Sequence, residues 1–177
     1  RKSTRYLIRQ GEKMGIKISH SAHIGNFLKL YEQTARRQGF VTHSAITQEY
    51  EVLHKQRNLV VFEAHHEGLL LSAAVILFFG EQAIYHHGAS IPSKIPASQL
   101  LQWHAIKEAK QAGLKLYNFW GIAPSDKINH PWRGLTLFKQ GFGGFEKQFI
   151  HARDLSISPF YQISYTIEWL RKLRKGY

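Results

Sequence analysis

The spacing of apolar residues along the chain changes near residue 59. Before that point, apolar side chains recur every three or four residues, which predicts a helix over residues 22–37 and a shorter one over residues 47–55. After it, apolar and β-branched runs are separated by short glycine-containing breaks, a pattern typical of consecutive strands. The predicted antiparallel strands are residues 59–66, 69–79 and 82–89.

A further helix is predicted over residues 99–112, closed by Gly113. Leu101, Ala105, Ala109 and Ala112 fall on one face of this helix, and the small alanine side chains favour close packing on a sheet. The run over residues 114–120 is nearly all apolar, which predicts a short strand at a buried central position. The remaining predicted elements are a helix over residues 132–140, a glycine-rich segment at 141–144, a strand over 146–155 and a last helix after Pro159.

This order of elements predicts an α+β fold with a mixed, mostly antiparallel sheet and helices on both faces, as in an acyltransferase-type lobe. The chain has 177 residues and 44% hydrophobic composition, enough for one substantial core. No apolar run approaches the roughly 18 residues that a membrane span needs, and the basic N-terminal segment is not followed by a signal-peptide pattern. We therefore expect a soluble protein.

Cysteine content and charge narrow the chemistry. The absence of cysteine excludes disulfides, thiolate metal sites and a cysteine nucleophile. A formal net charge of +12 favours polyanionic partners such as nucleic acid, phosphorylated small molecules or an anionic membrane surface, although a basic domain can also simply be a soluble one. The last predicted helix has an apolar stripe and a basic final turn formed by Arg171, Lys172, Arg174 and Lys175.

Three stretches of the chain carry a set of motifs. They are Leu100-Leu101-Gln102-Trp103, Tyr117-Asn118-Phe119-Trp120-Gly121-Ile122, and His130-Pro131-Trp132-Arg133-Gly134 running into Phe138-Lys139-Gln140-Gly141-Phe142-Gly143-Gly144. Together they resemble the second lobe of the Fem-type peptidoglycan aminoacyltransferases, and the last stretch is the most specific. The opening segment from Arg5 to Gly15 is similar to the end of that family's first lobe.

The resemblance implies a domain organisation and a function. Residues 1–18 would be the tail of a preceding acetyltransferase-like lobe, and residues 19–177 a second lobe with the acetyltransferase-like (GNAT) fold. The chain would then be part of a longer cytoplasmic enzyme, associated with the inner face of the membrane, that needs no cofactor. Its donor would be aminoacyl-tRNA, and its acceptor the stem peptide of a UDP-linked or lipid-linked muramyl-peptide precursor, in the formation of interpeptide bridges.

Lys139 is the candidate catalytic residue. Aminoacyl transfer from an ester to an amine passes through a tetrahedral oxyanion, which a preorganised positive charge stabilises. Lys139 lies between Phe138 and a glycine-rich turn that lets backbone approach a ligand closely, and it aligns with the family's catalytically important lysine. Phe138, Gly141 and Gly143 are accordingly candidate substrate-binding residues, although glycine-rich turns often only reverse the chain.

Four further residues are candidates for substrate binding. Tyr117 and Phe119 alternate onto the same face of their predicted strand, and Tyr117 is the preferred contact, with core packing as the alternative for both. Trp103 lies off the alanine face of its helix, where it could face the missing lobe. Arg133 could bind a phosphate in bidentate fashion, or be an ordinary surface arginine.

We predict no metal site from the sequence. The best histidine candidates are the pairs His65-His66 and His86-His87 on adjacent predicted strands. Neighbouring residues of a strand point to opposite faces, so each pair should contribute at most one ligand to any site.

Two other functions fit parts of the sequence. A small-molecule N-acetyltransferase using acetyl-CoA would share the fold, but residues 89–98, where a phosphate-binding loop is expected, contain prolines and no glycine. A non-catalytic module that binds RNA or membranes would explain the charge and the basic last helix. Lys139 discriminates between these functions, because a binding module would tolerate its loss and an aminoacyltransferase would not.

Overall fold

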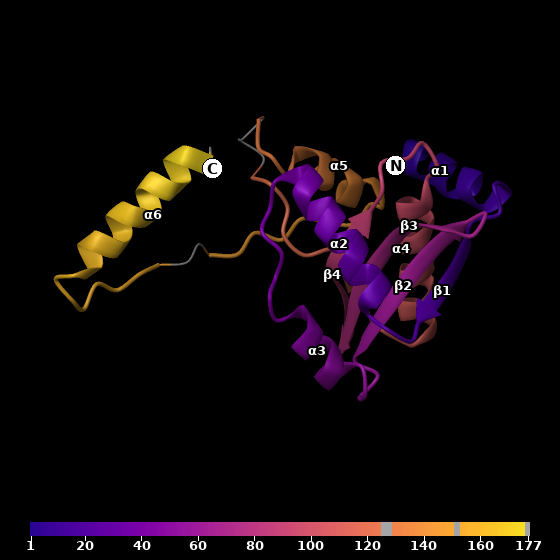
Figure 1. The fold of residues 1–177 in the computed structure, drawn as a ribbon, viewed down its shortest axis with the longest axis horizontal. Coiled ribbons are helices and arrows are strands. Elements are labelled where there is room, and N and C mark those ends of the chain that lie inside the picture. Colours follow the sequence, from indigo (N-terminus) through magenta and orange to yellow (C-terminus); the bar gives the residue numbers. More distant parts are fainter. Residues whose placement is uncertain (125–128, 151–152, 176–177) are drawn as a thin grey trace. The chain divides into compact units, whose positions relative to one another are not determined.

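The computed structural model describes residues 1–124, 129–150 and 153–175. They belong to two compact units, residues 1–121 and residues 122–177. The first unit contains the whole described sheet and four helices, and the second contains two helices (Figure 1). The helices are α1 (Lys2–Lys13), α2 (Gly25–Gln38), α3 (Ile46–Leu53), α4 (Ala97–Gln111), α5 (Arg133–Gly141) and α6 (Tyr161–Lys175).

A five-stranded sheet forms the centre of the first unit. Its strands are β1 (Lys17–Ser21), β2 (Leu59–His66), β3 (Leu69–Phe79), β4 (Gln82–Ser90) and β5 (Leu116–Asn118). They lie in the order β1-β2-β3-β4-β5, with antiparallel pairing among the first four and parallel pairing between β4 and β5. The predicted α+β fold with a mixed, mostly antiparallel sheet is confirmed.

The hairpin between β2 and β3 has the bounds expected from the sequence. Glu67 and Gly68 have φ angles of 50° and 80°, the left-handed conformation that a two-residue type I′ turn requires at both central positions. This turn matches the right-handed twist of the flanking strands. The turn places His66 opposite Leu69, and a β-bulge between Ala64 and His65 then shifts the register so that Val61 lies opposite Val75.

Helices cover both faces of the sheet (Figure 1). On one face, Phe27 and Tyr31 of α2 pack with Val61 of β2 and Val75 of β3, and all four side chains are buried. On the other face, α4 contacts β2 and β3, and Leu101, Ala105 and Ala109 are buried as the sequence predicts. The small side chains therefore allow α4 to lie close to the sheet. Ala112 of the predicted face is exposed, because the helix ends at Gln111.

Helix α1 packs against α4 rather than directly on the sheet. A Cβ atom added to Gly11 of α1 would lie 3.3 Å from the Cβ of Leu100 in α4, so the glycine permits close approach of the two helices. Gly15 follows α1 with a φ of 73°, the left-handed conformation in which glycine commonly ends a helix.

Two strand predictions are wrong. The strand expected at a buried central position over residues 114–120 is only β5, at the edge of the described sheet, and Leu116 is 44% exposed. It ends early because Trp120 takes a φ of 65° and its N–H bonds to the Asn118 side chain. The strand expected over residues 146–155 is absent from its described part, 146–150 and 153–155, where no neighbouring strand offers a backbone to pair with.

Helix α6 has the apolar stripe that the sequence predicts, and the stripe is exposed. The exposed fraction is at least 45% for each of its members, Ile163, Ile167, Leu170 and Leu173. Within the described residues, no helix has both the length and the apolar content needed to cross a bilayer.

Candidate functional site

Lys139 lies in the last turn of α5 and is the one charged side chain of the second unit's described residues that is buried. Its exposed fraction is 7%, and burial lowers the pKa of its ammonium group to about 8. The group is thus mostly protonated at neutral pH but loses its proton much more readily than a surface lysine. A buried cation of this kind is suited to stabilising a developing negative charge.

The residues that follow Lys139 end the helix. The N–H of Phe142 donates to the carbonyl oxygen of Lys139, and the N–H of Gly143 donates to that of Gln140, both at 3.2 Å. Gly143 and Gly144 have φ angles of 89° and 91°, which only glycine adopts without strain. The turn therefore reverses the chain directly after the lysine, and the Gly143 N–H is already used by the helix end.

The neighbouring candidates in this unit lie around the same helix. Phe138 is half-buried and packs edge-to-face on Phe142, with ring centroids 5.4 Å apart. The hydroxyl oxygen of Thr136 accepts a hydrogen bond from the N–H of Ala123 at 2.9 Å, which ties the segment before α5 to the helix. Arg133 is exposed at the first residue of α5, where its side chain is accessible to a ligand.

In the first unit, Tyr117 is anchored inside the fold. Its hydroxyl donates a 2.7 Å hydrogen bond to the Oε1 atom of Gln102, a buried residue of α4. Burial, together with the neighbouring Tyr85, raises the pKa of Tyr117, so its hydroxyl stays protonated. Phe119 lies just beyond the end of β5 and packs edge-to-face on Tyr117, with ring centroids 5.0 Å apart.

Sequence reasoning assigned no role to Gln102, although it lies in one of the motifs, and did not mention Tyr85. The side chain of Gln102 is buried, so it needs a hydrogen-bond partner inside the fold, and the Tyr117 hydroxyl provides one. Tyr85 packs 6.1 Å from Phe119, and a Cβ at Gly88 would lie 1.7 Å from the Tyr85 hydroxyl oxygen. Two features of the sequence could have pointed to these residues. Gln102 is a polar residue on an otherwise apolar helix face, and Gly88 is a glycine inside a strand, which makes room for the Tyr85 side chain.

Trp103 is partly exposed on α4. Its indole is 36% exposed, and the Lys107 ammonium lies 6.0 Å from the ring centroid. Its predicted place off the alanine face is confirmed, and it offers an aromatic surface to a ligand or a partner.

The two histidines of β4, His86 and His87, do not point to opposite faces of the sheet as predicted. Val75 pairs with His87 and Ile76 with Tyr85, which leaves His86 as an extra residue in a β-bulge. The rings of His86 and His87 consequently lie on the same side, with centroids 4.0 Å apart. The expectation that these two residues point to opposite faces is wrong here, because the alternation of faces fails at a bulge.

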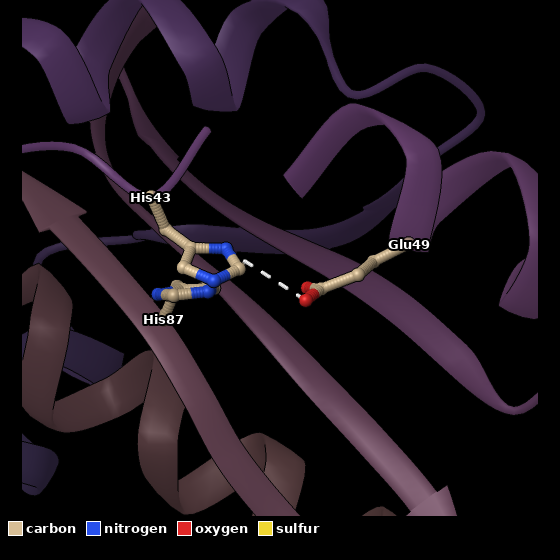
Figure 2. Close-up of side chains that lie close together, drawn as sticks. All are labelled: His43, Glu49 and His87. Carbon is tan, nitrogen blue, oxygen red and sulfur yellow. Dashed lines mark ion pairs between the residues drawn. The ribbon is translucent and has the colours of Figure 1, made fainter. Parts of the chain in front are cut away.

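A cluster of possible metal ligands surrounds this bulge. His43, Glu49 and His87 each offer a ligand atom, and these atoms lie within 4.8 Å of one another (Figure 2). Burial, with smaller contributions from the neighbouring His86 and His43, lowers the pKa of His87 to about 3, so its imidazole is neutral at physiological pH.

The fold defines the class of protein. The chain is similar to the crystal structure of FemX, with a TM-score of 0.71 and 20% identity over 80% of this chain and 53% of that one. It is also similar to a predicted acetyltransferase of Clostridium acetobutylicum solved with acetyl-CoA, with a TM-score of 0.58 and 11% identity over 78% of this chain and 96% of that one. The structure thus has the GNAT-like fold of acyltransferases.

Within that class the chain belongs to the FemAB family, whose model matches residues 42–168 and so covers Lys139 and its motif. Relatives include the lipid II:glycine glycyltransferase of Staphylococcus haemolyticus, 28% identical over 56% of this chain and 24% of that protein. The enzyme of the same name from Staphylococcus aureus is 29% identical over 61% of this chain and 27% of that protein. The matched region spans about a quarter of each of these relatives.

Proposed function

We propose that the protein to which this chain belongs is an aminoacyltransferase that moves an amino acid from aminoacyl-tRNA to the stem peptide of a peptidoglycan precursor. The observation that carries the proposal is Lys139, a buried cation within the segment that matches the FemAB family. The relatives named lipid II:glycine glycyltransferase support a lipid-linked acceptor and an acyl transfer reaction.

The reaction makes a clear demand on the protein. The acceptor amine attacks the ester carbonyl carbon, so a C–N bond forms and the carbonyl oxygen becomes an oxyanion. The intermediate then collapses with cleavage of the ester C–O bond, the amine loses a proton, and the ribose oxygen gains one. The Lys139 ammonium stabilises the oxyanion, and its burial strengthens the interaction because water does not screen it.

The other candidates would bind and orient the substrates. Phe138, Gly141 and Gly143 border Lys139 in sequence, and Arg133 at the start of the same helix would pair with a phosphate of the donor or the acceptor. Tyr117 and Phe119 present one aromatic face, although the bond of Tyr117 to Gln102 makes positioning the better-supported role for this tyrosine.

Two further candidate regions concern the surroundings of the reaction. Trp103, whose indole is partly exposed on α4, would contact a preceding lobe. Residues 1–18 would form the tail of that lobe. The charge of +12 and the amphipathic helix α6 are suited to tRNA and to an anionic membrane surface at the cytoplasmic side.

A donor assay with the full-length protein tests the proposal. We expect radiolabelled amino acid to move from charged tRNA to lipid II or to UDP-muramyl-pentapeptide, and acetyl-CoA not to be consumed. Acetyl-CoA is the rival donor because the Clostridium acetobutylicum neighbour is solved with it. Acetyl transfer to small amines without any aminoacyl transfer would refute the proposal in favour of an N-acetyltransferase.

The same assay separates catalysis from binding. Retention of charged tRNA or of vesicles containing phosphatidylglycerol, without transfer to either precursor from any charged tRNA, would instead indicate a non-catalytic module. Under that outcome Lys139→Met would weaken retention only slightly, because a single phosphate contact contributes modestly to such binding.

A further inference from the structure

Three separate parts of the first unit meet at the β4 bulge. His43 lies in the segment between α2 and α3, Glu49 in the first turn of α3, and His87 in β4 (Figure 2). The Nδ1 atom of His43 is 3.7 Å from the Oε1 atom of Glu49, and the ring centroids of His43 and His87 are 5.6 Å apart. The three side chains thus converge on one point from three directions.

The partly buried imidazole of His87 lacks a hydrogen-bond partner for one of its nitrogens, which is itself buried. Across the described part of the chain, no donor or acceptor pairs with its Nε2 atom. The ring is instead enclosed by Tyr31, whose ring centroid is 5.4 Å away, and by His86. A buried polar atom without a partner is unfavourable, and coordination of a cation by its lone pair would satisfy it.

The surrounding residues hold the other two side chains in place. The Nε2 atom of His86 lies 3.0 Å from Oε2 of Glu49, while Oε1 faces His43. The Tyr31 ring packs against Phe40, with ring centroids 5.5 Å apart, in the segment that leads from α2 to His43. Such outer contacts, which fix the orientation of the ligands, are characteristic of metal sites in proteins.

From this arrangement we infer that His43, Glu49 and His87 bind one divalent transition-metal ion, with Zn²⁺ the best match. Two imidazoles and one carboxylate favour Zn²⁺ or Co²⁺ over Mg²⁺ and Ca²⁺, which prefer oxygen ligands. Tetrahedral coordination with bonds of about 2 Å places ligand atoms roughly 3.3 Å apart. The separations of up to 4.8 Å between these atoms need only small side-chain rotations to reach that value.

The metal would connect α3 and the segment before it to the sheet. This part of the chain is held to the core mainly by Ile46, which is 3% exposed, and by partly buried neighbours such as Tyr50 and Leu53. A bound ion adds a link between this segment and β4 that the unfolded chain does not have, so metal should stabilise the folded state. The inference stands apart from the proposed aminoacyl transfer and does not depend on it.

Metal titration of the full chain, after dialysis against a chelator, tests the inference. We expect one Zn²⁺ per chain by calorimetry, one Co²⁺ with visible d–d absorption, a higher Tm with Zn²⁺, and no competition by excess Mg²⁺. Stoichiometric binding should be lost in Glu49→Gln and in His43→Ala. The His43 side chain is 49% exposed, so its replacement should leave the fold intact. His86→Phe should weaken binding roughly 10-fold to 100-fold, as expected for a residue that orients a ligand.

His20→Ala is the matched control, because His20 pairs with Glu108 at 2.8 Å on the surface and is remote in sequence from the cluster. We expect it to bind Zn²⁺ as the unmodified chain does. Absence of stoichiometric binding in the unmodified chain would overturn the inference. So would full binding by folded His43→Ala and Glu49→Gln, or equal loss in His20→Ala, since either outcome would place the ion elsewhere.

Discussion

The two units of the chain differ in which of their residues are buried. In residues 1–121 both faces of the sheet carry buried apolar side chains, and Phe27, Val61 and Val75 have no exposed surface. Among the described residues from 122 to 173, only Ala123, Lys139 and Gly141 are buried. The first unit therefore owes its structure to its own core, whereas the second buries a charge, which opposes stability and is expected of a functional residue.

The largest effect that this comparison predicts is on the core of the first unit. Phe27→Ala removes a fully buried ring packed 5.3 Å from Tyr31 and should lower the free energy of unfolding by about 3–5 kcal/mol. Urea denaturation followed by circular dichroism measures it. Val41→Ala, at a side chain that is 90% exposed, is the control and should change stability by less than about 0.5 kcal/mol.

A smaller effect is expected at the Tyr117–Gln102 hydrogen bond. Tyr117→Phe leaves the buried Oε1 atom of Gln102 without its donor and should cost about 1–3 kcal/mol of stability. Tyr165→Phe, at an exposed position of α6, serves as the comparison in the same denaturation experiment. Equal stability of the two variants would show that this hydrogen bond does not stabilise the fold. It would then favour a role for Tyr117 as a substrate contact.

The pH dependence of transfer probes the charge on Lys139. Because the pKa of its ammonium group is about 8, the charged form dominates below that pH and is lost above it. Single-turnover transfer by the full-length protein should therefore fall roughly tenfold per pH unit above about 8. Lys139→Arg keeps its charge through this range, so the variant should be slower but should not show that fall. If its pH profile matched that of the unmodified protein, the fall would come from another group.

The smallest effect is expected on α6. Leu170 is 53% exposed, so Leu170→Ser should change the free energy of unfolding by less than about 0.5 kcal/mol. Thermal unfolding of the purified chain measures this change. A loss of several kcal/mol would mean that the apolar stripe of α6 is covered in solution, and would remove the contrast between the two units.

Much of the first unit could be predicted because local rules determine it. Gly39 and Gly113 end α2 and α4 with φ angles of 71° and 80°, and the tight turn at Gly68 fixes the ends of β2 and β3. These are effects of glycine in the left-handed conformation, and they are visible in the sequence.

The failures of prediction have a common cause, which is dependence on distant residues. The length of β5 is decided by Asn118 and Trp120, whose backbone conformation no periodicity reveals. The bulge at His86 arises from pairing with β3, and it alone brings His86 and His87 to one side. At the candidate site, the motif pointed to Lys139, and its burial was a property that only the structure could show.

The most direct test of the central claim is the rate of aminoacyl transfer by the full-length protein with Lys139→Met, which keeps the bulk of the side chain and removes its charge. Loss of one oxyanion-stabilising group should lower the single-turnover rate about 100-fold to 1,000-fold while the folded state is retained. Lys110→Met, at an exposed lysine of α4, should transfer at the unmodified rate. Equal rates for the two variants would contradict the assignment of Lys139 as the catalytic residue.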